Sequence, residues 1–291
     1  MAELEGIYPA LVTPFTKTGM IDEKALCTII DDLLGKGIQG FYVGGSTGES
    51  LLMSKDERKA VLKLVVEHVN KRVKVLAHIG CFYTQDSIEL AEYAASLNVD
   101  AISSLPPFYF KFTLAELTQY YLDIVQAVPM PMIVYNAPAL SGVSFDSDNI
   151  KNIFQNENVI GIKYTSYDLY QMQRLIARNP NKTIINGHDE LFLSALAIGT
   201  RCAIGSTFNF MAEKFIKIKN NFQSSNLNEA RKLQNEANTV IEALIKVGVF
   251  RGVKGILNLI GLPGGNCRKP FAPLSAAEMK QLEEVLPLIV G

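Results

Sequence analysis

Short apolar runs alternate along the chain with longer segments in which apolar residues recur every three or four positions. The runs are rich in Val, Ile, Ala and aromatic residues and show little polar alternation, which is typical of parallel strands buried on both faces. We expect eight strands, at Ile7–Val12, Gly40–Val43, Lys74–Ile79, Ala101–Ser104, Met132–Tyr135, Val159–Lys163, Thr183–Asn186 and Cys202–Ile204.

The segments between these runs have the periodicity of amphipathic helices. Ser54 and Glu57 predict a capping box at the start of one helix, and Gly199 is expected to end another. The predicted helices are Asp22–Leu34, Ala60–Val69, Thr84–Leu97, Thr113–Val128, Asp146–Phe154, Leu169–Ala177, Asp189–Ile198 and Met211–Asn221.

Eight strands, each followed by a helix, predict a (β/α)8 TIM barrel of the α/β class. The alternative is an open doubly wound sheet, which usually has fewer repeats and a Gly-rich phosphate loop. The chain continues with helical patterns at Leu227–Val247, Phe250–Ile260 and Ala276–Leu288 and a loop rich in Gly and Pro at Gly261–Pro273. We therefore expect a barrel that carries the active site over residues 1–223 and a C-terminal helical extension over residues 224–291.

The composition excludes several classes of protein. The formal net charge is −1 and the charges are interspersed, so we expect no nucleic-acid partner. The acidic stretch Met1–Glu5 does not resemble a signal peptide, and no apolar run is long enough to span a bilayer. Four cysteines without a C-x-x-C pair indicate reduced thiols and a cytoplasmic location, and three scattered histidines predict no metal site.

Lys163 ends the apolar, β-branched run that starts at Val159. A lysine at such a place is most often a solvated strand end or an ion-pair partner. Apolar surroundings, however, favour the neutral amine, which is a nucleophile toward ketones. Because barrel enzymes carry their reacting groups at the C-terminal ends of strands, Lys163 is a candidate nucleophile.

Other polar residues follow neighbouring strands. The turn Gly44–Glu49 brings Ser46 and Thr47, whose hydroxyls and backbone N–H groups suit a carboxylate, but it matches no nucleotide-binding loop. Tyr135 ends the fifth strand, where a phenol can move a proton. The turns at Gly187–Glu190 and Gly205–Thr207 follow the seventh and eighth strands. Each feature alone also fits a structural role: an ordinary turn, a buried aromatic, or acids at a helix N-terminus.

Taken together, these groups suit one reaction. An amine that condenses with a 2-keto acid forms an iminium, and the iminium withdraws electrons so that a neighbouring C–C bond breaks or forms. A carboxylate clasp, a proton shuttle and a polar pocket complete the requirements. No external cofactor is expected.

The chain resembles the class I pyruvate aldolase family that includes dihydrodipicolinate synthase and N-acetylneuraminate lyase. The resemblance covers essentially the whole chain and is closer to the lyase branch, which has Ser46-Thr47 where the synthases have two threonines. Leu140 stands where the synthases carry an arginine. The other matching stretches are Tyr135–Gly142, Gly161–Thr165, Gly187–Glu190, Ile204–Asn209, Gly248–Gly252 and Cys267–Phe271.

The resemblance implies reversible cleavage of N-acetylneuraminate, a sialic acid, to N-acetylmannosamine and pyruvate. It assigns Lys163 to the Schiff base and Tyr135 to proton transfer, with Ser46 and Thr47 on the carboxylate of the pyruvate portion. It implies that the N-acetylmannosamine end is bound by Thr165, Gly187, Asp189, Glu190 and Ser206. It also implies a homotetramer in which Tyr109 is lent to the site of a neighbouring subunit.

Two residues depart from the pattern of the family. Tyr167 stands where lyases often have Gly, and His188 replaces an aromatic residue. We expect both to affect the preference among sialic acids more than the reaction type. Two other functions remain open: a sibling pyruvate aldolase that uses another aldehyde, and a sensor that binds sialate or 2-keto acids without turnover.

Overall fold

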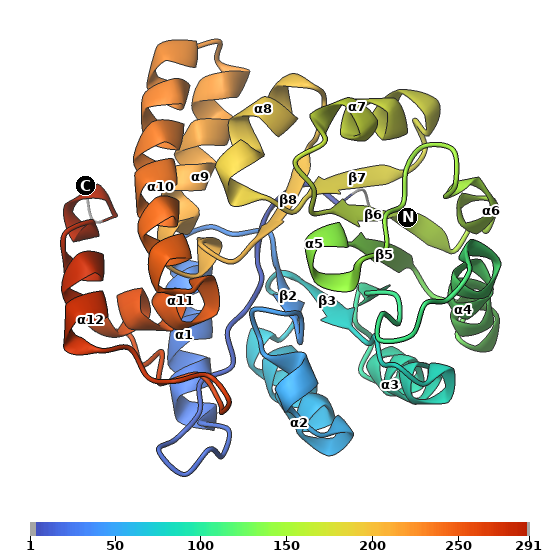
Figure 1. Ribbon diagram of the computed structural model, residues 1–291, viewed down its shortest axis with the longest axis horizontal. Coiled ribbons are helices and arrows are strands. Elements are labelled where there is room, and N and C mark those ends of the chain that lie inside the picture. The colour runs from blue at the N-terminus through green and yellow to red at the C-terminus, as the bar shows by residue number, and fades with distance from the viewer. Residues whose placement is uncertain (1–3, 290–291) are drawn as a thin grey trace. The chain divides into compact units, whose positions relative to one another are not determined.

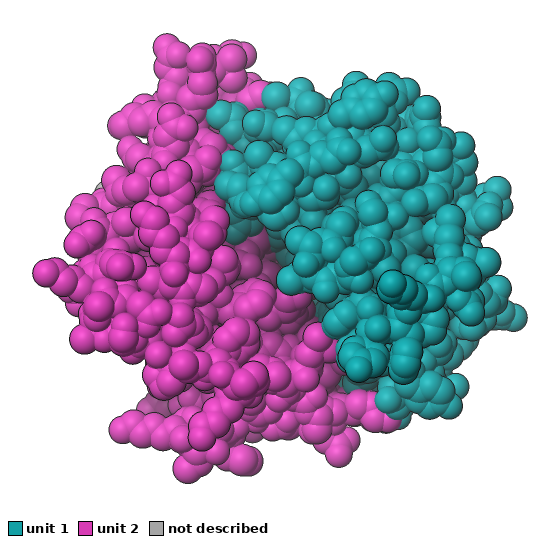
Figure 2. Space-filling model, viewed as in Figure 1, with its two compact units in different colours: residues 1–6, 74–204 teal, residues 7–73, 205–291 magenta. Residues whose placement is uncertain are grey.

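The computed structural model describes residues 4–289, so most of the acidic N-terminal stretch Met1–Glu5 lies outside the described residues. Figure 1 shows the chain as a ribbon. By its contacts the chain divides into two compact units, coloured separately in Figure 2. The first unit holds described residues 4–6 and 74–204, and the second holds 7–73 and 205–289. The boundary expected near residue 224 stays a prediction.

The first unit contains consecutive parallel strands with helices between them. Each strand from β3 to β7 pairs in parallel with the next one. The strands are β3 (Lys74–His78), β4 (Ala101–Ser104), β5 (Met132–Asn136), β6 (Val159–Tyr164), β7 (Thr183–Asn186) and β8 (Cys202–Gly205). The helical segments are α3 (Thr84–Ser96), α4 (Leu114–Ala127), α5 (Pro138–Ser141), α6 (Lys151–Phe154), α7 (Leu169–Arg178), the 3₁₀ turn η2 (Asp189–Leu191) and α8 (Phe192–Ala197).

The second unit contains the two remaining strands and the C-terminal helices. Its elements are β1 (Gly6–Pro9), α1 (Glu23–Gly35), β2 (Gly40–Val43), η1 (Ser50–Leu52), α2 (Lys55–Val69), α9 (Phe208–Gln223), α10 (Leu227–Val247), α11 (Val249–Leu259), α12 (Ala276–Glu283) and η3 (Leu286–Leu288). Only the first residue of β1, Gly6, belongs to the first unit, and only the last residue of β8, Gly205, belongs to the second. In Figure 1, α9 and α10 lie side by side, and α11 packs against both of them.

The eight strands have the hydrogen-bonded order β1-β8-β7-β6-β5-β4-β3-β2. Together with the intervening helices, this order confirms the predicted (β/α)8 barrel, here with additional C-terminal helices. The strands are almost entirely buried, which explains why their sequences are continuous apolar runs rather than alternating ones.

The predicted strands are all present, with small differences at their ends. The capping box of Ser54 and Glu57 is confirmed at the start of α2. The helix expected over Asp146–Phe154 is wrong for its first half, since only Lys151–Phe154 is helical. There, Asp146 accepts hydrogen bonds from the N–H groups of Asp148 and Asn149, and such side-chain bonds compete with a helix.

Candidate functional site

Tyr135 and Lys163 lie next to each other on adjacent strands. They are direct partners in the parallel register of β5 and β6, so their side chains point to the same face of the sheet. The Lys163 Nζ lies 4.2 Å from the centroid of the Tyr135 ring. Both residues are buried, with exposures of 5% for Lys163 and 4% for Tyr135. The structure thus brings together the two residues for which the sequence predicts chemistry.

His78, at the end of β3, contacts Tyr135. Its ring meets the Tyr135 ring edge to face, with centroids 6.1 Å apart and an interplanar angle of 88°. The backbone N–H of Leu105 donates to His78 Nε2 at 3.2 Å. Sequence reasoning did not predict this contact, for which the only signal was the place of His78 at a strand end.

Thr165 and Gly187 also lie together, at the ends of β6 and β7. The N–H of Thr165 donates to the carbonyl of Asn136 at 2.8 Å, and the N–H of Gly187 donates to that of Tyr164 at 3.0 Å. A Cβ atom at position 187 would lie 2.0 Å from Thr165 Oγ1, so only glycine fits there. The Thr165 hydroxyl oxygen is buried and has no hydrogen-bond partner among the described residues.

Glu190 and His188, in the turn after β7, form a polar cluster with Tyr167, which follows β6. Glu190 Oε1 accepts a hydrogen bond from the Tyr167 hydroxyl at 2.7 Å and lies 3.1 Å from His188 Nδ1. Burial opposes ionisation of Glu190, but the contacts with His188 and Tyr167 outweigh it and lower the pKa of the carboxyl. The same hydrogen bond raises the pKa of Tyr167 to about 12. Asp189, in the same turn, is buried.

Tyr109 and Leu140 are both exposed. Tyr109 is 79% exposed and belongs to a cluster of aromatic side chains, meeting Phe110 edge to face at 5.2 Å. Phe110 in turn contacts Phe112 at 6.0 Å. Leu140, on α5, is also exposed.

The remaining predicted site residues belong to the second unit. The hydroxyls of Thr47 and Ser206 are hydrogen-bonded at 2.7 Å, which joins the turns after β2 and β8. Asn209 supports this arrangement, because its amide donates to the carbonyls of Ser206 at 2.8 Å and Ala10 at 2.7 Å. Ser46 is half-buried in the same turn as Thr47.

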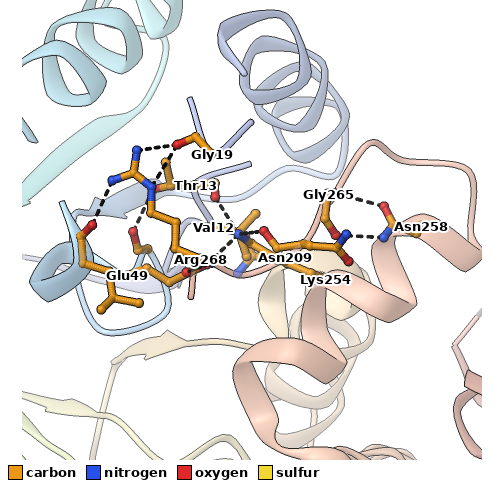
Figure 3. A network of polar contacts seen from close by, with 12 residues as sticks. Val12, Thr13, Gly19, Glu49, Asn209, Lys254, Asn258, Gly265 and Arg268 are labelled. Carbon is orange, nitrogen blue, oxygen red and sulfur yellow. Dashed lines mark hydrogen bonds and ion pairs between the residues drawn. The ribbon is translucent and has the colours of Figure 1, made fainter. Parts of the chain in front are cut away.

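A buried ionic network anchors the turn that carries Ser46 and Thr47 (Figure 3). Lys254 of α11 donates to Glu49 Oε1 at 2.5 Å and to the carbonyls of Thr13 at 2.7 Å and Asn266 at 3.1 Å. The backbone N–H of Arg268 donates to Glu49 Oε2 at 2.8 Å. Sequence reasoning missed this network, although a lysine on the apolar stripe of the predicted helix Phe250–Ile260 was a signal for it.

The first unit offers an amine beside a phenol on adjacent strands. Within residues 4–289, no three His, Cys, Asp or Glu side chains form a group suited to a metal ion. None of the described helices combines the length and apolar character needed to cross a bilayer. An amine in this setting suits covalent catalysis on a carbonyl compound.

Comparisons with known proteins agree with this chemistry. A family model described as the dihydrodipicolinate synthetase family matches residues 3–288. The chain is 40% identical to an N-acetylneuraminate lyase of Rhizobium meliloti (strain 1021) over 289 residues, which cover 99% of this chain and 96% of the relative.

Two solved structures are also very similar. A structure of CdNal from Clostridium difficile in complex with mannosamine has a TM-score of 0.96 at 34% identity, covering 99% of this chain and 100% of the other. An N-acetylneuraminate lyase from Fusobacterium nucleatum complexed with pyruvate has a TM-score of 0.93 at 34% identity, covering 99% of this chain and 98% of the other.

Proposed function

This chain belongs to the dihydrodipicolinate synthetase family, and we propose that it is a Schiff-base aldolase that reversibly cleaves N-acetylneuraminate to N-acetylmannosamine and pyruvate. The observation that carries the proposal is the pairing of Lys163 with Tyr135 on adjacent strands, with Nζ 4.2 Å from the ring centroid. The 40% identical relative from Rhizobium meliloti is named an N-acetylneuraminate lyase, and this name supports the same carbon–carbon lyase activity.

The reaction starts at Lys163. Its neutral amine attacks the C2 ketone of the open-chain sugar acid, and loss of water gives an iminium. The iminium accepts the electron pair of the C3–C4 bond as that bond breaks, while the C4 hydroxyl loses its proton and becomes the aldehyde of N-acetylmannosamine. The enamine that remains is protonated at C3 and hydrolysed, which releases pyruvate and restores the amine.

Tyr135 is the proposed proton shuttle. The phenol oxygen of Tyr135 can accept the proton that leaves the C4 hydroxyl while its own O–H proton passes to the carboxylate of the substrate, and both transfers reverse in the aldol direction. The contact between Tyr135 and His78, at 6.1 Å between ring centroids, supports a defined orientation of the phenol. Burial of both Tyr135 and Lys163 favours chemistry away from bulk water.

The two ends of the substrate need different partners. Ser46 and Thr47 are proposed to hold the carboxylate of the pyruvate portion with hydroxyl and backbone N–H donors. The proposed ligands of the sugar end are Thr165, Gly187, Asp189, Glu190 and Ser206. The unpaired, buried hydroxyl oxygen of Thr165 supports this role, because a buried polar atom normally has a hydrogen-bond partner.

Assembly and location complete the proposal. We expect a homotetramer in the cytoplasm that needs no cofactor beyond the covalent bond between Lys163 and its substrate. The exposed Tyr109 is proposed to reach the site of a neighbouring subunit, and its exposure of 79% in this chain supports a contact with another copy.

The test is reductive trapping. Pyruvate followed by borohydride should add a stable adduct to Lys163, detected by mass spectrometry of peptides, and N-acetylneuraminate should release pyruvate in a coupled assay. Replacing Lys163 with Ala should abolish both while far-ultraviolet circular dichroism stays unchanged. A folded wild-type protein without the adduct would rule the proposal out.

The same assay separates the alternatives. A sibling aldolase would form the adduct but prefer aspartate semialdehyde or a simple sugar-acid aldehyde over N-acetylmannosamine. A sensor would bind sialate without releasing pyruvate.

A further inference from the structure

Tyr167, His188 and Glu190 form a small cluster in the first unit. The Tyr167 hydroxyl donates to Glu190 Oε1 at 2.7 Å, and His188 Nδ1 lies 3.1 Å from the same oxygen. The rings of Tyr167 and His188 are stacked, with centroids 4.3 Å apart and an interplanar angle of 22°. Two side chains that support each other therefore hold one carboxylate oxygen.

We propose that Tyr167 and His188 are specificity-determining residues that hold Glu190 as a fixed hydrogen-bond acceptor for the hydroxylated tail of the aldehyde fragment. The inference rests on the proposed function, in which Glu190 binds the sugar end. Tyr167 and His188 are positioning residues, since they act through Glu190.

The contacts of Tyr167 and His188 favour one protonation state and one orientation of the Glu190 carboxylate. An ionised carboxyl group is only an acceptor, and hydrogen bonds from two donors stabilise the ionised form. Direct contact with both donors lowers the pKa of Glu190 even though burial opposes ionisation. Stacking restricts the rotation of both rings, so the direction of the Glu190 side chain is also restricted.

The positions of the three residues in the chain connect the cluster to the sugar end. Tyr167 follows β6 two residues after Thr165, and His188 and Glu190 lie in the turn that begins with Gly187. The side-chain amide of Asn186, the last residue of β7, donates to the backbone carbonyl of His188 at 2.8 Å and fixes the start of that turn. The cluster thus joins the two segments that carry most of the proposed sugar ligands.

An acceptor-only carboxylate selects its ligand by charge and by donors. It binds the hydroxyl groups of a neutral polyol and repels a tail that carries a carboxylate or a phosphate. Buried Asp189, beside Glu190 in the chain, is a second acid in this turn. The substrate class is therefore a neutral, polyhydroxylated aldehyde rather than an acidic one.

The experiment compares two aldehydes in the aldol direction with pyruvate. N-acetylmannosamine has a hydroxylated tail, whereas D-glyceraldehyde is too short to present one. Replacing Tyr167 with Phe keeps the ring and removes the donor, so kcat/KM for N-acetylmannosamine relative to D-glyceraldehyde should fall about three- to tenfold, the usual effect of one hydrogen bond. The KM for pyruvate and the borohydride adduct on Lys163 should not change.

Tyr170→Phe is the matched control. Tyr170 lies three residues further along the chain, on α7, and is 70% exposed, so loss of its hydroxyl should leave the ratio unchanged. His188→Phe keeps an aromatic ring for stacking and removes Nδ1, and it should lower the same ratio. The double variant should lower the ratio by less than the product of the two single effects, because both donors act on one oxygen.

The outcomes separate this inference from the proposed function. If Tyr167→Phe leaves the ratio unchanged, or lowers kcat/KM equally for both aldehydes, while the adduct still forms, the specificity role is wrong. If the wild-type protein forms no pyruvate adduct, the proposed function itself fails.

Discussion

Lys254 and Glu49 form an ion pair of 2.5 Å inside the second unit, with side-chain exposures of only 2% and 1%. Burial lowers the pKa of Lys254, and the carboxylate of Glu49 opposes that shift. Glu49 has a φ of 59°, which is unusual for a residue other than glycine. Hydrogen bonds to both of its oxygens, from Lys254 and from the N–H of Arg268, hold it there.

We expect Lys254→Met to destabilise the protein by about 3–5 kcal/mol, because it leaves the charge of Glu49 buried without its partner. Urea unfolding followed by circular dichroism measures the loss. The double variant Glu49→Gln with Lys254→Met should recover part of it, since no charge is then buried. Lys232→Met, at an exposed lysine on α10, is the control, and equal stability of the two single variants would contradict the prediction.

Arg268, whose backbone N–H contacts Glu49, also forms an ion pair with Glu57, and this pair predicts that stability depends on pH. Hydrogen bonds from Arg268 are the main cause of the lowered pKa of Glu57, which is about 2 in the folded protein. A glutamate in the unfolded chain titrates near pH 4.3. Because the folded pKa is the lower one, the pair stabilises the protein above about pH 4.3, and this contribution disappears as the pH falls toward about 2.

Urea midpoints of the wild type and of Glu57→Gln at several pH values test this. The difference between the two proteins should be largest near neutrality and vanish in strong acid. Glu284→Gln, at an exposed residue outside this pair, controls for the loss of one charge. A difference that is constant across the range would refute the role of Arg268.

Tyr135→Phe should lower kcat by about 10²- to 10⁴-fold, the typical contribution of general acid–base catalysis. The variant should still form the borohydride adduct with pyruvate, because Lys163 is intact. Steady-state kinetics and peptide mass spectrometry give the two readouts. Unchanged kcat would remove Tyr135 from the mechanism, and Tyr170→Phe serves again as the control for the loss of a phenol.

Gly187→Ala should damage the contact between the ends of β6 and β7. The new Cβ would lie 2.0 Å from Thr165 Oγ1 and 3.1 Å from the Thr165 Cα, so the backbone must shift. We expect a loss of about 1–3 kcal/mol, as for other overpacked sites, and a raised KM for N-acetylmannosamine. Gly35→Ala is the control, since its Cβ would meet no atom within 4 Å, and an equally mild effect at both sites would contradict the prediction.

The pattern of apolar runs was sufficient for the strands but not for every helix. Continuous runs such as Met132–Tyr135 and Val159–Lys163 are distinctive, because strands covered on both faces have no polar side. The short helix Pro138–Ser141 was missed, since four residues carry no periodicity. The segment from Asp146 was misjudged because its polar side chains bond to nearby backbone instead of leaving it helical.

Local sequence patterns likewise predicted some features of the candidate site and missed others. Strand-end position and residue type made Lys163, Tyr135 and Thr47 candidates, and their roles stay predictions. The orphan hydroxyl of Thr165 and the contact of His78 with Tyr135 were not accessible from local patterns. Both depend on which strands are neighbours and on how their residues are aligned.

By itself, the sequence determined the eight strands, most of the helices and which reactive groups stand at the strand ends, because these depend mainly on residues close together in the chain. Only the tertiary structure decided which side chains meet. Glu49 and Lys254 are 205 positions apart, and Tyr167 and Glu190 are 23 apart. Such pairs arise from the packing of whole elements, and local hydrophobic periodicity contains no information about their distance.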